Sequence, residues 1–206
     1  MPFIYKFLYR VIWILAKIIF RFEIIGKEKI PKDKNFIIFA NHIALTDPIF
    51  LAFAVGRKRQ VHFMAKEELF KNHKFFGGLL SKLGAFSINR DVGIEGINTA
   101  IDLVKNGGIL GMFPEGTRSK TGKLGHAKSG IALIMCQTKS DVLPCVIKCK
   151  DQKVRPFRKV TIEIFDLISA DELKLDDITN HRELKKITTK IMTPIQEVLE
   201  PTVSEE

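Results

Sequence analysis

Residues 35–55 of the 206-residue chain read NFIIFANHIALTDPIFLAFAV. The first six, 35–40, form an apolar run that predicts a buried β-strand. A turn over 41–47 follows, and Pro48 begins an apolar helix over 48–55, because proline is favoured in the first turn of a helix. A buried strand that leads through a short turn into an apolar helix is the repeating unit of an α/β domain.

The rest of the chain continues this alternation. Further strands are predicted over 21–25, 60–65, 85–88, 109–113, 142–147 and 159–165, and further helices over 67–82, 92–106, 128–138 and 179–199. We expect the helix over 67–82 to break near Gly77-Gly78. The pattern predicts an α/β fold, a single domain over 26–206 with a central mixed sheet flanked by helices. Residues 1–25 form a separate N-terminal segment.

The composition excludes several classes of protein. Hydrophobic residues make up 46% of the chain, which is enough for a core and argues against disorder or a collagen-like repeat. The chain has 3 cysteines, too few for a secreted disulfide framework and too few for a four-cysteine zinc site, so we expect a reducing compartment and no metal. The net charge of +10 indicates an anionic partner: nucleic acid, a membrane surface or a phosphorylated substrate.

The N-terminal segment predicts an amphipathic helix over 3–20. Its apolar run is interrupted by four bases, Lys6, Arg10, Lys17 and Arg21. Neither a spanning helix nor a cleaved signal peptide fits this pattern. At about 100° per residue the four bases fall in one stripe about 60° wide, and apolar side chains cover the remaining surface. The pattern is typical of a helix that lies in the membrane interface; the alternative is a first helix packed on the domain's own core.

Asn41, His42 and Asp47 lie in the turn after the first buried strand. Asp47 precedes Pro48, so we expect it to cap the helix, with one carboxylate oxygen on the helix amides and the other on a histidine N–H. That contact would fix the tautomer of His42 and leave its second ring nitrogen as a general base. The alternative is a structural cap beside an incidental histidine.

A second group of polar residues follows the strand over 109–113, where residues 111–119 read GMFPEGTRS. Backbone amides, the hydroxyl of Thr117 and the guanidinium of Arg118 suit a phosphate group. Three lysines keep the following segment positive, Lys120, Lys123 and Lys128. The glycine spacing of a Walker loop is absent, and an ordinary basic turn is the alternative interpretation.

Arg90 is the third candidate, at the end of the short strand over 85–88. It is a candidate for binding an anion, because a guanidinium at a strand end can reach into a site built from neighbouring loops. A surface ion pair with Asp91 or Glu95 is an equally good interpretation of this residue alone.

Together these segments resemble the glycerolipid acyltransferase family, above all the 1-acylglycerol-3-phosphate acyltransferases. That family carries Asn-His, four residues and Asp, then a strand that ends in Arg, then Phe-Pro-Glu-Gly-Thr-Arg-Ser, then a strand similar to Val-Pro-Val. The matches are Asn41, His42 and Asp47; Arg90; Phe113 to Ser119 in full; and, more loosely, Leu143 to Val146. Two positions depart from the pattern, Ala44 in place of the usual Ser and Cys145 in place of an aliphatic residue. Lys66 resembles a lysine of a family segment between the first two motifs.

The resemblance implies transfer of a fatty acyl chain from a thioester to the sn-2 hydroxyl of 1-acylglycerol 3-phosphate, which gives phosphatidate. It implies that His42 is the general base and that Asp47 orients it. The implied substrate-binding residues are Asn41, Lys66, Arg90, Glu115, Gly116, Thr117 and Arg118, with Asn41 also a candidate for supporting the oxyanion. No cofactor and no metal are implied; the acyl donor is a co-substrate, either acyl coenzyme A or acylated acyl carrier protein.

Several alternatives stay open at this point. The acceptor is a lysophospholipid, and another lysolipid or glycerol 3-phosphate itself would fit the same motifs. A different class is a membrane-surface lipid-binding protein without catalysis, against which the His42–Asp47 pair argues. Nucleic-acid binding is not expected, because aromatic and basic residues do not alternate as in a stacking surface. We expect attachment to one side of the membrane, on its cytoplasmic face, without a spanning segment.

Overall fold

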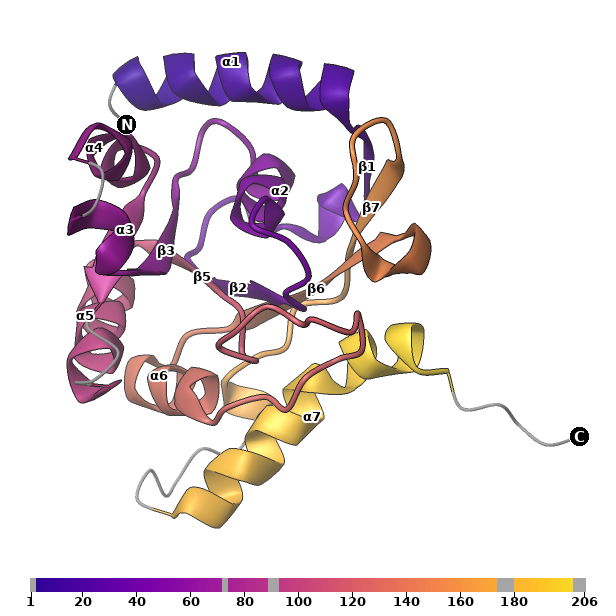
Figure 1. The fold of residues 1–206 in the computed structure, drawn as a ribbon. Coiled ribbons are helices and arrows are strands. Elements are labelled where there is room, and N and C mark those ends of the chain that lie inside the picture. Colours follow the sequence, from indigo (N-terminus) through magenta and orange to yellow (C-terminus); the bar gives the residue numbers. More distant parts are fainter. Residues whose placement is uncertain (1–2, 72–73, 89–92, 174–179, 202–206) are drawn as a thin grey trace, which may run out of the picture.

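The computed structural model describes residues 3–71, 74–88, 93–173 and 180–201. A seven-stranded sheet with the order β1-β7-β6-β2-β5-β3-β4 crosses the molecule (Figure 1). The strands are β1 Arg21–Ile25, β2 Ile37–Ala40, β3 Val61–Lys66, β4 Ala85–Ile88, β5 Ile109–Met112, β6 Val142–Cys149 and β7 Lys159–Ile164. All neighbouring pairs are parallel except β6 and β7, so the sheet is mixed, as the sequence predicted.

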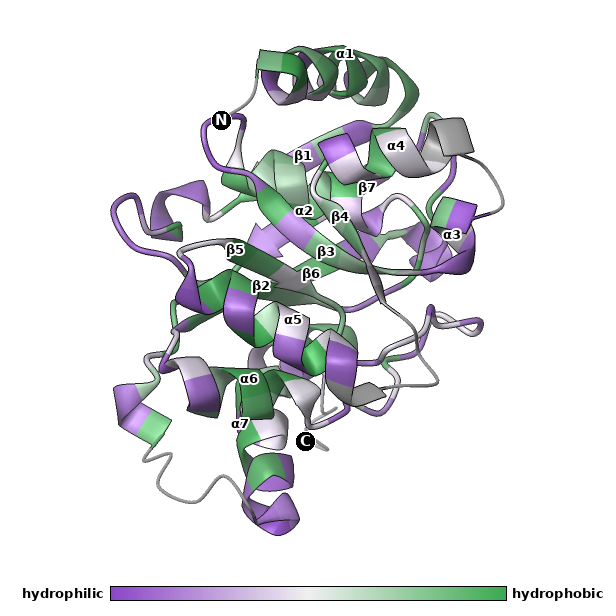
Figure 2. Ribbon diagram, turned by 90° about the vertical axis from the view of Figure 1, so that its left-hand side faces the viewer, coloured by the Kyte–Doolittle hydropathy of each residue, from purple (hydrophilic) through white to green (hydrophobic). Residues whose placement is uncertain are grey.

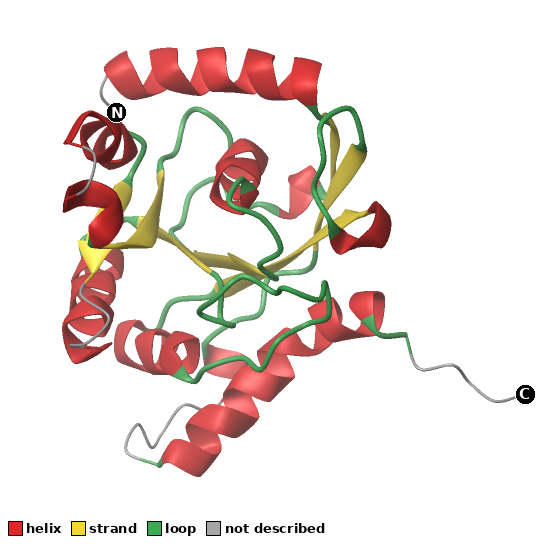
Figure 3. Cartoon of the chain, in the orientation of Figure 1, coloured by secondary structure: helices red, strands yellow, loops and turns green. Residues whose placement is uncertain are grey.

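Helices cover both faces of this sheet (Figure 3). They are α1 Phe3–Ile19, α2 Asp47–Val55, α3 Glu68–Lys71, α4 Lys74–Lys82, α5 Gly93–Lys105, α6 Gly130–Thr138 and α7 His181–Leu199. Three 3₁₀ turns lie in connections, at Lys27–Lys29, Lys150–Gln152 and Asp171–Leu173. Two hydrophobic cores result: α5, α6 and α7 pack on one face, and α1 and α2 pack on the other.

The central strands are apolar along their whole length because both of their faces are covered. Every residue of β2 and of β5 is buried, including Ile37, Phe39 and Leu110. The apolar run that predicted a buried strand is therefore confirmed as the middle of the sheet.

The helix predicted over 67–82 differs from the structure in the position of its break. α3 ends at Lys71 and α4 begins at Lys74, and both Gly77 and Gly78 lie inside α4. Gly77 is buried against the preceding helix, where an added Cβ would lie 2.8 Å from the Cα of Phe70. The predicted break near the two glycines was wrong, because Gly77 allows a close approach of two helices instead of ending one.

The N-terminal helix α1 packs on the domain with one side and exposes the other to solvent. One side packs on the domain: Tyr5 and Ala16 are buried, and the ring of Tyr9 meets Phe53 of α2 edge-to-face at 5.4 Å. The Nζ of Lys17 also turns inward, 3.0 Å from the carbonyl oxygen of Phe22. The outward side carries exposed apolar side chains, those of Phe3, Ile4, Phe7, Val11, Ile14, Leu15 and Ile18. The hydropathy colours of Figure 2 show that most of α1 is hydrophobic. Among the described helices, none is long and apolar enough to cross a membrane.

Candidate active site

The sheet topology brings two polar loops together. β2 lies between β5 and β6, and all three run in the same direction. The loop after β2 carries His42, and the loop after β5 carries Glu115 and Arg118, so both loops emerge from the carboxyl edge of the sheet. In open α/β sheets this edge is the usual place for a binding crevice. The backbone N–H of Ser119 donates to the carbonyl oxygen of His42 at 2.7 Å, which joins the two loops directly.

His42 and Asp47 form a hydrogen-bonded pair. The Nδ1 of His42 lies 2.8 Å from the Oδ2 of Asp47. Because an ionised carboxylate only accepts hydrogen bonds, Nδ1 carries the proton and Nε2 is left with its lone pair. The side chain of Asp47 is fully buried and that of His42 is 16% exposed. The pair therefore presents one basic nitrogen at a partly open position, as a general base requires.

The details of Asp47 differ from the capping role expected of it. Asp47 is the first residue of α2, whose N-cap position is Thr46, and the helix start shows no side-chain cap. The Oδ2 that meets His42 also accepts the backbone N–H groups of Ile43 and Ala44, both at 2.7 Å. The prediction that the carboxylate binds helix amides was wrong. The carboxylate of Asp47 instead accepts hydrogen bonds from the loop that precedes the helix. Those bonds offset part of the cost of burying the carboxylate.

Glu115 ties three parts of the site together. Its Oε1 accepts the backbone N–H of His42 at 2.7 Å, and its Oε2 accepts the backbone N–H of Gly125 at 2.7 Å. The residue is 6% exposed. Burial raises the pKa of Glu115, and its hydrogen bonds to His42 and Gly125 act in the opposite direction. Both oxygens are engaged with backbone, so the geometry favours a positioning role for Glu115 over the substrate contact expected from the sequence.

An aromatic stack, which the sequence analysis did not predict, supports the ring of His42. The rings of His42 and Phe113 are stacked with centroids 4.1 Å apart, and Phe113 stacks in turn on Phe63 of β3 at 6.1 Å. Gly111 makes room for this stack, because an added Cβ would lie 2.2 Å from the ring of Phe63. Glycine at this buried strand position is the one trace of the stack in the sequence.

The polar residues after Glu115 face solvent. Thr117 and Arg118 are exposed, and Arg118 has no ion-pair partner within the described part of the chain. Gly116 has a positive φ of 72°, and the side chain of Lys128 lies across it: an added Cβ would be 3.2 Å from the Lys128 Nζ. The backbone N–H of Lys128 donates to the carbonyl oxygen of Pro114 at 2.8 Å, which fixes this lysine beside the loop. Lys128 thus adds a cation to the predicted phosphate-binding loop.

Asn41 is buried beside the site but points into the sheet. Its Oδ1 accepts the backbone N–H of Ile147 at 2.8 Å, and its Nδ2 donates to the carbonyl oxygen of the same residue at 3.0 Å. These two bonds extend the pairing of β2 with β6 by one residue. The arrangement favours a structural role over the substrate-binding and oxyanion roles considered from the sequence.

Of two further predicted residues, the structure describes only the backbone of Lys66 and does not describe Arg90. Lys66 is the last residue of β3, where it pairs with Ile88 of the parallel neighbour β4, and its side chain lies outside the description. Arg90 lies outside the described residues altogether. β3, which ends at Lys66, runs parallel to β5, and the loop after β5 carries Glu115.

A comparison with protein families identifies the family of the chain. The acyltransferase family model matches residues 21–148, which run from β1 through most of β6 and include both loops. The chain belongs to the acyltransferase family. Within this acyltransferase, His42, Asp47 and Glu115 all lie inside the matched region, as does Lys128.

Two proteins similar to this acyltransferase have the same name. A 1-acyl-sn-glycerol-3-phosphate acyltransferase of Bacillus subtilis is 33% identical over 156 residues, which cover 75% of this chain and 76% of that protein. A protein of the same name from Streptococcus pneumoniae is 31% identical over 180 residues, covering 85% of this chain and 65% of that one.

A solved structure shares the fold of this acyltransferase. The crystal structure of the 1-acyl-sn-glycerophosphate (LPA) acyltransferase PlsC from Thermotoga maritima superposes with a TM-score of 0.70. The match covers 98% of this chain and 79% of that one, at 24% sequence identity. The likeness supports the arrangement of the sheet and the helices around the site.

Proposed function

We propose that the protein transfers a fatty acyl chain from a thioester to the sn-2 hydroxyl of 1-acylglycerol 3-phosphate, forming phosphatidate. The observation that carries the proposal is the His42–Asp47 pair at 2.8 Å, tied to the loop of Glu115 and Arg118 by the bond from Ser119. This arrangement supports the proposal, because the reaction needs a general base and cations that can hold a phosphate. The names of the relatives support the same acceptor.

The chemical step follows from the free nitrogen of His42. An alcohol is a weak nucleophile at neutral pH, so Nε2 removes the hydroxyl proton as the oxygen attacks the thioester carbonyl carbon. Asp47 holds the ring and stabilises the imidazolium that forms. The tetrahedral intermediate then collapses, the carbon–sulfur bond breaks and the thiolate leaves. The thiolate takes up the proton from the imidazolium, so the products are the new ester and a free thiol.

The acceptor's phosphate is held by the loop after β5. Arg118 presents a fork of N–H donors that suits phosphate oxygens, and Lys128 adds a second positive charge over Gly116. Holding the phosphate positions the hydroxyl at His42, which converts binding energy into rate. Arg90 and Lys66 are further candidates for this binding. No cofactor is required by this scheme, and the donor is acyl coenzyme A or acylated acyl carrier protein.

One assay tests the reaction. Purified protein in detergent is given each thioester donor with each acceptor: 1-acylglycerol 3-phosphate, a lysolipid without a terminal phosphate, and glycerol 3-phosphate. We expect phosphatidate, identified by mass, from the first acceptor alone at a substantial rate. Faster acylation of either other acceptor would contradict the assignment, and hydrolysis without transfer would contradict the whole mechanism.

The attachment to membranes is part of the proposal. The acceptor and the product are amphiphiles, and the exposed apolar side of α1 supports insertion into the interface of a bilayer on the cytoplasmic side, where thioester donors occur. Deletion of residues 1–20 is expected to reduce co-sedimentation with anionic vesicles and transfer to vesicle-borne acceptor, while transfer to a dispersed short-chain acceptor is retained. Undiminished sedimentation of the truncated protein would contradict α1 as the anchor.

A further inference from the structure

The connection between β6 and β7 contains an unusual turn. The backbone N–H of Arg158 donates to the carbonyl oxygen of Arg155 at 3.3 Å, so Pro156 and Phe157 are the central residues of a four-residue turn. Phe157 has a φ of 62°. Proline followed by a residue of positive φ is the pattern of a type II turn, in which glycine or asparagine normally takes the second central position. A bulky aromatic residue in this conformation is strained.

Burial of the side chain does not compensate for this strain. The side chain of Phe157 is 69% exposed, so the unfavourable backbone conformation does not serve to fill a core. A glycine at the same position would satisfy the turn without strain and without exposing an aromatic ring to water. Backbone strain that keeps an apolar side chain exposed to solvent indicates that this side chain contacts another molecule.

The turn is attached to the end of α1. The backbone N–H of Phe157 donates to the carbonyl oxygen of Ile19 at 2.6 Å, and the N–H of Arg21 donates to the carbonyl oxygen of Arg158 at 3.3 Å. In Figure 1 the β6–β7 loop, drawn in orange, rises beside the C-terminal end of α1. Phe157 therefore lies next to the C-terminal end of that helix, where Ile18 is 65% exposed.

Exposed bases lie on both sides of Phe157 in the sequence. Lys153, Arg155 and Arg158 flank Phe157 in the sequence, and Arg21 lies at the point where β1 meets the same turn. All four are exposed, and none has a salt-bridge partner within the residues that the structure describes. An exposed apolar side chain with exposed bases near it in the chain is complementary to a bilayer with anionic headgroups and an apolar interior.

We infer that residues 153–158 form a second membrane-contact element, in which Phe157 inserts into the interface of an anionic bilayer beside α1. Arg155, Arg158 and Lys153 contact lipid phosphates, as snorkelling bases do at membrane surfaces. The inference rests on the proposed membrane attachment and extends it, because two separate contacts fix the orientation of the protein on the surface as well as its binding.

The first experiment reports the environment of residue 157 directly. Trp13 is the one tryptophan of the chain, so Phe157→Trp in a Trp13→Phe background gives a single fluorophore. Vesicles of phosphatidylcholine with phosphatidylglycerol are expected to shift its emission to shorter wavelength and to protect it from a soluble quencher. Gln137→Trp in the same background is the matched control, since exposed Gln137 lies on α6, on the opposite face of the sheet, and should show neither change.

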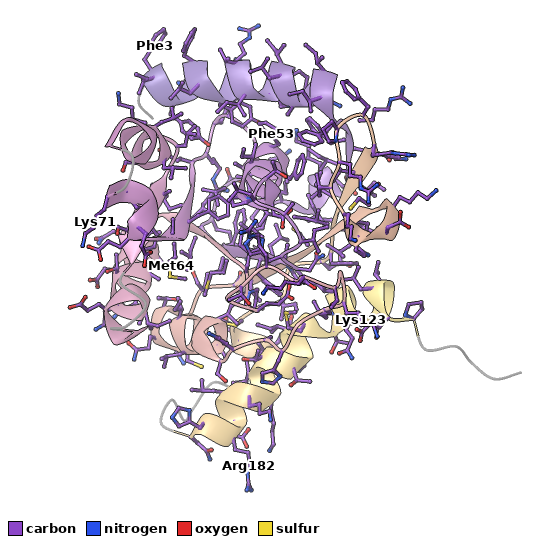
Figure 4. All side chains as sticks on the ribbon, viewed as in Figure 1. Phe3, Phe53, Met64, Lys71, Lys123 and Arg182 are labelled. Atoms are coloured by element: carbon purple, nitrogen blue, oxygen red, sulfur yellow. The ribbon has the colours of Figure 1, made fainter. Side chains whose placement is uncertain are left out.

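The second experiment measures binding. Phe157→Gly removes both the ring and the strain, so the vesicle partition coefficient should fall about tenfold, while the melting temperature stays the same or rises. Charge reversal at Arg155 or Arg158 should lower partition into anionic vesicles about fivefold each and leave partition into neutral vesicles nearly unchanged. Arg182→Glu is the control, because Arg182 lies at the end of α7 farthest from Phe3 of α1 (Figure 4).

The outcomes distinguish failure of this inference from failure of the proposed membrane attachment. If the wild-type protein binds vesicles but Phe157→Trp shows no shift and Phe157→Gly binds equally well, the loop is not a contact and α1 acts alone. If the wild-type protein fails to bind vesicles, membrane attachment fails and the loop inference fails with it. Concentration-dependent dimerisation that Phe157→Gly abolishes, without any vesicle shift, would instead show that the turn docks on a second copy of the chain.

Discussion

The carboxylate of Glu115 accepts the backbone N–H of His42 at 2.7 Å, although 73 residues separate the two in the chain. The bond holds the backbone of His42, the proposed general base, while Asp47 holds its ring. The second oxygen of Glu115 holds Gly125, where an added Cβ would lie 2.6 Å from that oxygen. The buried side chain of Glu115 therefore joins the loop of His42 to the loop after β5, for which we propose phosphate binding.

We expect substitution of Glu115 to reduce kcat much more than it changes the acceptor's KM. In Glu115→Gln the amide nitrogen must face one of the two backbone N–H donors, so one bond is lost and His42 is displaced. Glu115→Ala leaves both donors unpaired and should destabilise the fold by about 1–3 kcal/mol. Steady-state kinetics and urea unfolding measure the two effects. An increase in the acceptor's KM at unchanged kcat would indicate that Glu115 contacts the substrate.

The pH dependence of stability provides an independent measure of Glu115. Its pKa in the folded state is raised above the ordinary value of 4.5 by burial. The folded protein therefore holds this proton more tightly than the unfolded chain, and the stability that this group contributes is lost as pH rises from 4.5 through the folded-state pKa. The unfolding free energy of the wild type minus that of Glu115→Gln should fall over this range and then level. A difference that rises with pH would contradict the direction of the shift.

The roles of His42 and Asp47 are tested by a pair of variants. His42→Ala should abolish transfer and keep the fold, because the ring is partly exposed and its loss leaves a small gap. Asp47→Asn should reduce transfer strongly, because the amide can donate to Nδ1 and stabilise the wrong tautomer. It should also lower stability, since Ile43 and Ala44 lose a charged acceptor. Circular dichroism checks the fold, and a near-normal rate in His42→Ala would contradict the mechanism.

Phosphate recognition is expected to depend on Arg118 and Lys128 together. Arg118→Ala and Lys128→Met should each raise the acceptor's KM about tenfold or more, because a charged hydrogen bond contributes about 1.5–3 kcal/mol. The donor's KM should change little. Lys123→Met is the matched control, since Lys123 is an exposed lysine of the same segment whose side chain does not lie over Gly116. Equal effects on donor and acceptor would indicate a structural role for either residue.

The strands and their polar ends were predictable from the sequence because they depend on local patterns. The apolar run of β2 and the alternation of β7 each reflect the burial of their own side chains. The motif of His42 and Asp47 follows β2, and the motif of Glu115 and Arg118 follows β5. The parallel pairing of β2 with β5 brings the two motifs together. The family resemblance indicated that the two motifs form one site, which their spacing along the chain does not reveal.

What the sequence did not reveal depends on contacts between distant backbone groups. Both donors to Glu115 are main-chain N–H groups, which have the same chemistry in every residue, so no side-chain pattern marks them. Asn41 appeared to be a candidate for the oxyanion because an amide suits that role, yet it pairs with the backbone of Ile147. The strained turn at Phe157 is similarly invisible until its φ is known.

Gly111 offers a test of the aromatic stack. Gly111→Ala places a methyl group where only 2.2 Å separates it from the ring of Phe63, which is 8% exposed and packed in the core. The ring must move, and Phe63 supports Phe113, which in turn supports His42. Overpacking of this kind costs about 1–3 kcal/mol, so the melting temperature should fall.

The stack also predicts how that variant behaves as an enzyme. If displacement of Phe63 reaches His42 through Phe113, kcat should fall while the acceptor's KM changes little, because Arg118 and Lys128 do not touch the stack. The double variant Gly111→Ala with Phe63→Leu restores room for the added methyl group, and it should recover part of the stability and part of kcat. Recovery of stability without any recovery of kcat would show that the stack does not position the base.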